Sequence, residues 1–314
     1  VAIDGSTIVV GAPGTTDRTT GLPGDRGRAY VYRTTDGWAS HTEIKLTADD
    51  AEERAGVGGA VAIAGGTIVV GAWNNQGAGA AYVYRTTDGG GTYPQVAKLS
   101  SGCVNVLYPS QPCSGEAFGA SVAISESGDT IVAGAWGHDD AKYDAGTYSA
   151  SSDMGSAYVL RTTDDWSTHT TTKLTAADAA KGDEFGISVA IDGSTVVVGA
   201  YCDDDAGTDS GSAYAFRTTD GWDTYAEVAK LTATDGAYED LFGQSVAIYG
   251  STVVVGASQS RKLALGLCPA NDCSGAAYLF RTQDEGATYG QMAKLTATDA
   301  AAADGFGWSV AFDS

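Results

Sequence analysis

Short apolar runs alternate with turn-forming residues along the whole chain, and the same order of runs recurs. The run Val-Ala-Ile or Val-Ala-Phe begins at Val1, Val61, Val122, Val189, Val246 and Val310. These starting points lie 57 to 67 residues apart. A fixed period of this length is the signature of a repeat architecture, so the chain contains five complete repeats and the start of a sixth.

Each repeat contains four short runs with the character of β-strands. In the repeat that begins at 189 they are "SVAI" (188–191), "TVVVGA" (195–200), "SAYAFR" (212–217) and "YAEVAKLTA" (225–233). The second run is apolar at nearly every position, which is typical of a strand covered on both faces, and the third alternates. Segments of helical period are lacking. The pattern predicts an all-β fold, a β-propeller of four-stranded antiparallel blades.

We expect residues 1–314 to form a single propeller. Its repeats span about 1–60, 61–121, 122–188, 189–245 and 246–309, and 310–314 begin a further one. The ring should hold five to seven blades. With five, Val310–Phe312 and Val1–Ile3 would compete for one inner-strand position, which favours the larger ring. The chain starts inside a repeat without an initiator Met, which suggests a mature or partial chain.

The repeated dipeptides Phe-Gly and Gly-Ala resemble those of the FG-GAP repeat, the blade of integrin α-subunit propellers and of many secreted repeat proteins. Phe-Gly occurs at Phe118-Gly119, Phe185-Gly186, Phe242-Gly243 and Phe306-Gly307, each of the first three followed by Gly-Ala. The repeat that begins near Val61 departs from the pattern, with "VGGA" (57–60) in place of Phe-Gly. The resemblance covers essentially the whole chain and implies an extracellular or cell-surface protein.

The turns between the third and fourth strands resemble Asp-boxes, the hairpin motif of sialidase-type propellers. Two read Thr-x-Asp-x-Gly-x-Thr-Tyr, at 86–93 and 282–289. Three other repeats place a tryptophan at the glycine position: Trp38, Trp166 and Trp222. The aspartate can accept backbone N–H groups across the turn. The motif is architectural, so it indicates fold and does not indicate sialidase chemistry.

Integrin-type blades carry a calcium loop between strands one and two, but here that connection is only "DGS" or "SESGD", too short to surround a cation. Acidic residues gather one connection later. Asp203, Asp205 and Asp209 are spaced D-x-D-x-x-x-D around Gly207, and could converge on calcium; Asp139, Asp140 and Asp144 form a weaker candidate. The alternative is a solvated acidic loop that holds no cation. Calcium is the only cofactor expected.

Four of the five cysteines form two close pairs in proline-containing loops, Cys103 with Cys113 and Cys268 with Cys273. Metal-binding Cys-x-x-Cys spacing is absent. Two local disulfides are the favoured interpretation, and they imply an oxidising compartment. Cys202 is left over. It could be a small buried apolar residue, a thiol or an interchain bridge.

The net charge and the missing catalytic motifs disfavour several classes of partner and activity. Asp and Glu total 39 against 18 Lys and Arg, for a net charge of −21, which disfavours nucleic acid and anionic lipid as partners. The longest apolar runs are far shorter than a membrane-spanning helix requires. Ten of the eighteen basic residues recur at equivalent places in the repeats instead of converging once. Ser-His-Asp order, P-loop and Gly-x-Ser-x-Gly motifs are absent, so we expect no enzymatic activity.

Aromatic residues directly after Gly-Ala, at Trp73, Trp136 and Tyr201, favour recognition of a protein or glycan at one rim. We therefore expect a non-catalytic extracellular propeller that serves adhesion, surface coating or assembly, with a protein, a glycan, another copy or another chain as its partner. The alternative is a calcium-dependent, lectin-like carbohydrate-binding module. A glycan-active enzyme is the third possibility.

Overall fold

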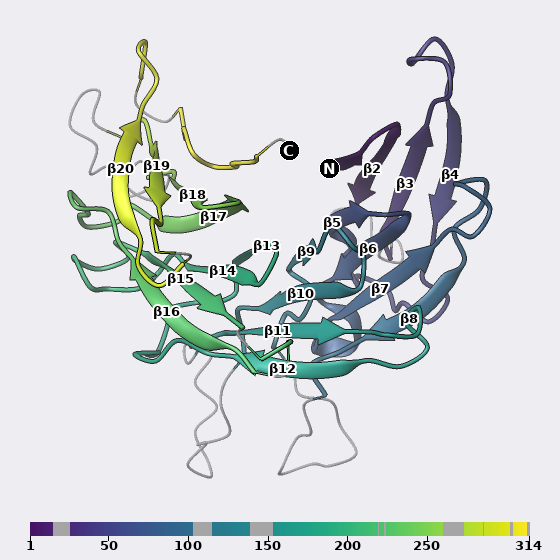
Figure 1. The fold of residues 1–314 in the computed structure, drawn as a ribbon, viewed down its shortest axis with the longest axis horizontal. Coiled ribbons are helices and arrows are strands. Elements are labelled where there is room, and N and C mark those ends of the chain that lie inside the picture. Colours follow the sequence, from purple (N-terminus) through teal and green to yellow (C-terminus); the bar gives the residue numbers. More distant parts are fainter. Residues whose placement is uncertain are drawn as a thin grey trace. The chain divides into compact units, whose positions relative to one another are not determined.

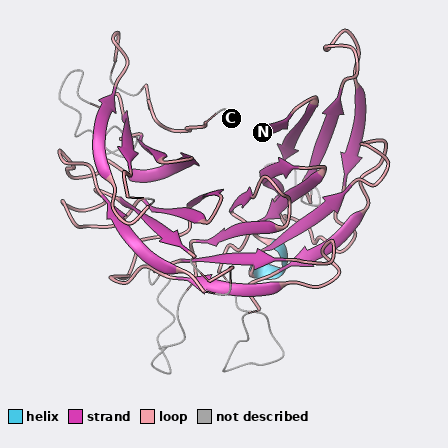
Figure 2. Cartoon of the chain, viewed as in Figure 1, coloured by secondary structure: helices cyan, strands magenta, loops and turns pink. Residues whose placement is uncertain are grey.

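The computed structural model describes residues 1–14, 26–102, 115–138, 153–218, 220–222, 224–259, 273–284, 286–301 and 304–312. Within these ranges, strands β1 to β20 form five four-stranded sheets, and Asn75–Gly77 form one turn of 3-10 helix (Figures 1 and 2). In each sheet the strands lie side by side in chain order. The chain is therefore an all-β protein built of four-stranded propeller blades, which confirms the predicted fold class.

The strand bounds follow the predicted runs. The first sheet holds β1 (Ala2–Asp4), β2 (Thr7–Ala12), β3 (Arg28–Arg33) and β4 (Thr42–Leu46), and the second β5 (Val57–Ala64), β6 (Thr67–Ala72), β7 (Ala80–Arg85) and β8 (Gln95–Leu99). The third holds β9 (Ser121–Ile124), β10 (Thr130–Ala135), β11 (Ser156–Arg161) and β12 (Thr170–Leu174). The fourth holds β13 (Ser188–Asp192), β14 (Thr195–Ala200), β15 (Ser212–Arg217) and β16 (Ala226–Leu231), and the fifth β17 (Phe242–Tyr249), β18 (Thr252–Ala257), β19 (Ala276–Arg281) and β20 (Gly290–Leu295).

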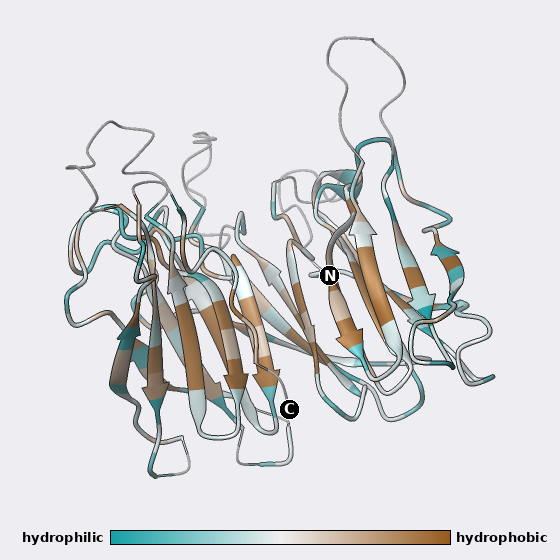
Figure 3. Cartoon of the chain, turned by 90° about the horizontal axis from the view of Figure 1, so that it is seen from above, coloured by the Kyte–Doolittle hydropathy of each residue, from teal (hydrophilic) through white to brown (hydrophobic). Residues whose placement is uncertain are grey.

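The second strand of each sheet forms the centre of the core. All six residues of β6, β10 and β14 are buried, as the unbroken apolar runs predict. Side chains on both faces of these strands are removed from water, and such burial is the main favourable contribution to folding. Figure 3 shows the apolar residues along the strands and the polar ones in the turns.

The chain divides into two compact units. One comprises Val1–Lys142 with Tyr158–Thr171, and the other comprises Tyr143–Ala157 with Thr172–Ser314. Each unit packs its own apolar clusters, one around Ile68 and Tyr82 and one around Phe242 and Val255. The number of blades in a complete ring stays a prediction.

The two dipeptides that define the repeat contact each other across neighbouring sheets. A methyl group added at Gly199 would lie 1.9 Å from the carbonyl oxygen of Gly243, and one added at Gly71 would lie 2.0 Å from that of Gly119. The Gly-Ala glycine of one blade is thus pressed against the Phe-Gly glycine of the next. Only glycine fits there, and the Phe-Gly glycines also have positive φ.

The phenylalanine of the same dipeptide is a core residue. Phe242 is fully buried, packs edge-on against Tyr278 of its own sheet and forms a parallel bridge with Gly211 of the preceding one. In the divergent repeat Val57 takes this place, buried and bridged to Gly27 in the same way. An aliphatic side chain therefore substitutes for the phenylalanine without loss of the bridge.

The turns between the third and fourth strands have the hydrogen bonds expected of Asp-boxes. In the turn after β7, Asp88 Oδ1 accepts the N–H groups of Gly91 and Thr92 at 2.8 and 3.0 Å. Hydrogen bonds from Ser40 and Thr34 lower the pKa of the equivalent Asp36 to about 2. Trp38, Trp166 and Trp222 have positive φ, as do the glycines at this position in the other turns. The position demands a left-handed backbone, and three tryptophans adopt it.

Candidate functional site

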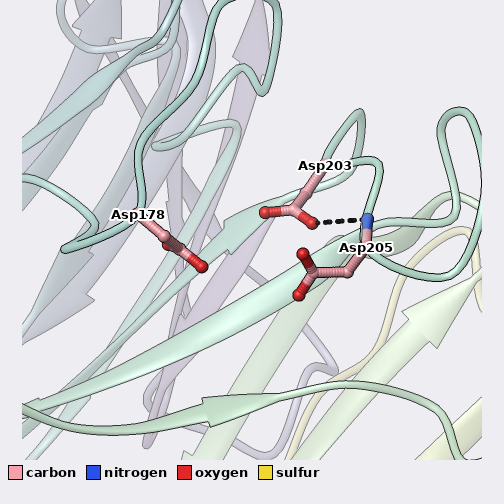
Figure 4. A group of neighbouring side chains, drawn as sticks. All are labelled: Asp178, Asp203 and Asp205. Carbon is pink, nitrogen blue, oxygen red and sulfur yellow. Dashed lines mark hydrogen bonds between the residues drawn. The ribbon is translucent and has the colours of Figure 1, made fainter.

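The acidic loop of the fourth sheet lies beside a lysine and a tyrosine of the same sheet. Asp203 and Asp205 follow β14, and Asp178 lies in the linker before β13 (Figure 4). Lys230 comes from β16 and Tyr214 from β15, where the two are paired across neighbouring strands. Carboxylates from two connections thus meet the side chains of two strands.

Lys230 occupies the place among the carboxylates that a cation would take. Its Nζ lies 2.6 Å from Asp178, 3.1 Å from Asp203 and 2.5 Å from Asp205, and 5.2 Å from the centre of the Tyr214 ring. The Tyr214 hydroxyl lies 2.7 Å from Asp203 Oδ2 and 2.9 Å from Asp178 Oδ1. Burial opposes the lysine charge, but hydrogen bonds to these carboxylates outweigh it and raise the pKa of Lys230.

One ammonium does not neutralise all the acid in this region. Asp183, in the same linker as Asp178, accepts the N–H of Ala180 at 2.7 Å and is buried. Burial, reinforced by the negative charges of Asp203 and Asp178, raises the pKa of Asp183 to about 6. Asp183 is therefore protonated at a higher pH than an ordinary aspartate.

The predicted calcium ligands come together only in part. Asp203 and Asp205 are neighbours, and their third carboxylate is Asp178, with oxygens of all three within 4.8 Å of one another. Asp209 was the third predicted ligand; its N–H donates to Asp204 Oδ1 at 2.8 Å and its carbonyl accepts the N–H of Leu241. Calcium at this loop stays a prediction, and Asp139, Asp140 and Asp144 lie outside the described residues.

The same arrangement recurs in other sheets. We call it the linker–sheet triad: an aspartate of one linker, with the third-strand tyrosine and fourth-strand lysine of the next sheet. Its members are Asp50, Tyr82 and Lys98 in the second sheet, Asp178, Tyr214 and Lys230 in the fourth, and Asp235, Tyr278 and Lys294 in the fifth. The lysine–aspartate distances are 2.5 to 2.6 Å. The triad fastens each of these sheets to the segment before it.

One residue beside the tyrosine differs from sheet to sheet. The third residue after Gly-Ala is Asn75, His138 or Asp203, each buried and each within hydrogen-bond reach of the tyrosine hydroxyl of its sheet. In the third sheet His138 Nδ1 also lies 3.0 Å from Glu116, which Ser101 contacts in turn. The position of this residue beside the tyrosine hydroxyl is constant, and its side chain is an amide, an imidazole or a carboxylate in different sheets.

The predicted binding aromatics are partly exposed. The Trp73 side chain is 42% exposed, and its indole covers the backbone of Gly56, where a methyl group would lie 2.6 Å from Nε1. Trp136 and Tyr201 are half-buried. Cys202 and Cys273 are buried. Cys103, Cys113 and Cys268 lie outside the described residues, so both disulfides stay predictions.

Sequence reasoning missed the triad although its parts were visible. The linker aspartates and the lysines before leucine both recur, but their pairing crosses from one repeat into the next. Asp178 and Lys230 are 52 residues apart. The signal that could have joined them was the constant place of each residue in its repeat. The aspartate lies seven residues before the Phe-Gly position, and the lysine directly precedes the leucine that ends the fourth strand.

The comparisons with known proteins agree with this architecture. The family model described as FG-GAP repeat matches residues 41–84, 104–160, 168–216, 225–280 and 289–314. The chain belongs to the FG-GAP repeat family. Searched against curated proteins, the sequence finds no match.

A solved structure shares the fold. It is titled a putative 6-phosphogluconolactonase from Bacteroides uniformis, with a TM-score of 0.51 and 10% sequence identity over 94% of this chain and 69% of that one. At this identity the likeness concerns the fold alone. Within the described residues, none of the helical structure is long and apolar enough to cross a membrane.

Proposed function

We propose that this chain is a non-catalytic extracellular propeller that binds a protein or glycan through its rim loops, in adhesion, surface coating or assembly. The observation that carries the proposal is the loop 203–210. It is fixed by its own hydrogen bonds, from Asp205 N to Asp203 Oδ1, from Ser210 Oγ to the Asp203 carbonyl and from Gly211 N to the same carbonyl. A loop already ordered before binding loses little entropy on binding.

The loop is also joined to the following linker, and together they expose side chains suited to recognition. Glu239 N donates to the Thr208 carbonyl at 2.8 Å, which places Tyr238, 43% exposed, beside the loop. Asp204 and Asp205 are exposed as well. An exposed aromatic ring among fixed acidic groups suits a polar ligand such as a glycan or a basic protein segment.

The test compares two exposed tyrosines, Tyr238 in the linker before β17 and Tyr249 at the end of that strand. The protein is applied to a glycan array and to a panel of extracellular proteins as wild type, Tyr238→Ala and Tyr249→Ala, the latter 51% exposed at the end of β17. We expect a specific ligand whose binding falls at least tenfold in Tyr238→Ala and not in Tyr249→Ala. Equal effects of the two substitutions, or turnover of an arrayed glycan, would refute the proposal.

A calcium-dependent, lectin-like module is the second candidate, favoured by the three carboxylates whose oxygens lie within 4.8 Å. The arrays are therefore repeated with EDTA. Binding to a glycan that is abolished by EDTA and restored by calcium favours the lectin. Binding that is indifferent to EDTA favours recognition by the protein groups alone.

A further inference from the structure

A hollow of about 340 Å³ lies where turns of the fourth and fifth sheets meet. Its lining includes Asp192, Arg217, Gly250, Ser251, Gly286 and Tyr289. The volume is near the lower limit of small-molecule sites, about 300 Å³. Among the described lining residues one is positively charged and one is negatively charged, which suits a neutral ligand. We call this hollow the fifth-sheet pocket.

The pocket lies beside a hairpin turn that lacks a tryptophan. The turns 218–225 and 282–289 read TTDGWDTY and TQDEGATY, so both have the same threonines, aspartate and tyrosine, but Gly286 stands where the fourth sheet has Trp222. In both turns the hydroxyl of the first threonine accepts the N–H of this residue, at 3.1 Å from Trp222 and at 2.8 Å from Gly286. The two backbones therefore follow the same course, and only the ring is missing.

The fourth sheet shows where that ring would lie. The rings of Trp222 and Tyr225 are neighbours there, with their centres 6.3 Å apart. In the fifth sheet the tyrosine is kept as Tyr289, which lines the pocket together with Gly286. The pocket thus contains the space beside a tyrosine that an indole ring takes in the preceding sheet.

The third sheet shows how such an indole is held. Trp166 is 1% exposed, and its Nε1 donates to the carbonyl of Gly128 at 3.1 Å. The counterpart of Gly128 in the fifth sheet is Gly250, because the next residues, Asp129 and Ser251, each accept the N–H of the first threonine of the hairpin turn. Gly250 lines the pocket, so an acceptor for an indole N–H is available there.

We propose that the fifth-sheet pocket binds a small neutral molecule that carries an indole ring. The ring lies beside Tyr289, and its N–H donates to the carbonyl of Gly250. Aromatic pairs of this kind are stabilising beyond the area that they bury, and a guanidinium such as that of Arg217 can stack on an aromatic face. The volume is that of a site for one small molecule, so the ligand is a free compound and not a tryptophan of another polypeptide.

The other glycine-type turn differs in the space around its glycine. A methyl group added at Gly90 would lie 2.8 Å from Cδ of Arg33. At Gly286 the corresponding distance, to Cδ of Arg217, is 3.6 Å. The arginine stem therefore lies against the glycine in the second sheet and stands clear of it in the fifth. We expect one indole to bind per chain.

This inference goes beyond the proposed function, since the pocket includes the turn before β14 and the rim loop 203–210 follows that strand. Either can fail without the other. The probe is indole itself, titrated by calorimetry and by thermal unfolding, because a ligand that binds only the folded state raises the melting temperature. The matched control compound is 1-methylindole, which has the same ring system and lacks the N–H donor.

We expect the wild-type protein to bind indole at least about fivefold more tightly than 1-methylindole, since the second compound leaves the acceptor without a hydrogen bond. Gly286→Trp places an indole in the pocket from within and should abolish binding. The backbone tolerates this residue, because φ is 94° at Gly286 and 85° at Trp222. Val96→Trp is the control variant; it adds an indole at an exposed position of β8 and should bind indole as the wild type does.

Wild-type affinity for indole in Gly286→Trp, or equal binding of indole and 1-methylindole, would overturn the proposal. So would binding of glucose, or of a peptide that contains tryptophan, by a protein that does not bind indole. The comparison of the two compounds uses wild-type protein only, so it remains decisive if Gly286→Trp fails to fold.

Discussion

At the residue scale, Lys230 contacts more carboxylates than any other lysine described above. Its Nζ contacts three aspartates and its side chain is 19% exposed, whereas Lys98, in the equivalent place, contacts one and has a side chain that is 29% exposed. Removing Lys230 leaves a crowded group of carboxylates without their counter-ion. That cost is large when the group is partly buried and small for an ordinary exposed pair.

We therefore expect Lys230→Met to lower the free energy of unfolding by about 2–4 kcal/mol, and Lys98→Met by about 1 kcal/mol. Chemical denaturation measures both. Because Lys230→Met frees three convergent carboxylates, calorimetry should also detect tighter calcium binding in this variant than in wild type. Tight calcium binding by the wild type that Lys230→Met does not improve would contradict this account of Lys230 as the resident cation.

Asp183 makes the stability depend on pH. Its pKa in the folded protein, about 6, lies above the ordinary aspartate pKa of 3.8, so the folded state holds the proton more tightly than the unfolded state. The stability that the bound proton contributes is fully present below about pH 4 and is lost as the pH rises through 6. Asp183→Asn keeps an acceptor for the Ala180 N–H and has no charge to bury.

Asp183→Asn should be more stable than wild type at pH 8, by on the order of 2 kcal/mol, and the difference should vanish below about pH 4. Urea midpoints across this range provide the measurement. Asp240→Asn is the matched control, because Asp240 accepts the N–H of Ala237 in the next linker. Parallel curves for wild type and Asp183→Asn would show that the charge of Asp183 has no influence.

At the scale of the element, two of the hairpin turns have a tryptophan with the same backbone conformation. The two tryptophans differ in how deeply they are buried, so the effect of burial can be tested separately from that of the backbone. Trp166 and Trp38 both have φ 71°, but Trp166 is 1% exposed and its Nε1 donates to the Gly128 carbonyl, whereas Trp38 is 43% exposed. Glycine would relax the backbone at both places. Only at Trp166 would it also remove a packed ring.

Trp166→Gly should lower the free energy of unfolding by about 3 kcal/mol. Trp38→Gly should stay within about 1 kcal/mol of wild type, because the relief of backbone strain offsets a small loss of contact. Thermal unfolding followed by circular dichroism compares the two. A large loss in both variants would mean that the tryptophan ring, and not its burial, stabilises the turn.

The contact between Gly-Ala and Phe-Gly is the second feature at this scale. Gly199→Ala would bring a methyl group to 1.9 Å from the Gly243 carbonyl oxygen, so the two sheets must separate. We expect a loss of more than about 3 kcal/mol, or failure to fold. Gly290→Ala, with open space around its Cβ, is the control and should be nearly neutral. Wild-type stability in Gly199→Ala would show that the sheets are free to move apart.

At the scale of the whole molecule, charge is the dominant variable. The net charge is −21, so the excess carboxylates repel one another, and added salt screens that repulsion. Raising NaCl from about 20 to 200 mM should therefore raise the melting temperature by a few degrees. Calcium chloride at equal ionic strength separates screening from specific binding. An unchanged melting temperature in NaCl would mean that the charges lie too far apart to matter.

The sequence predicted the fold well because its signals are local. The run "TVVVGA" at 195–200 coincides with β14, and its apolar character at every position anticipates burial on both faces. The calcium ligand set stays a prediction. What the sequence did not indicate are the groups that Asp203 and Asp205 lie beside, because Asp178 and Lys230 come from other segments. The backbone N–H of Asp209 donates to Asp204 Oδ1, and spacing alone does not reveal such hydrogen bonds.

The contact between the Gly-Ala of one blade and the Phe-Gly of the next has a consequence for how such chains evolve. The same glycine contact recurs at four junctions, Gly11 with Gly58, Gly71 with Gly119, Gly199 with Gly243 and Gly256 with Gly307, and Val57 shows that even the neighbouring phenylalanine can be exchanged. At these four junctions the contact is therefore the same whichever repeats meet there. Duplication or deletion of a whole unit recreates this junction, so gene lengthening by unequal crossing-over meets little structural resistance in this fold.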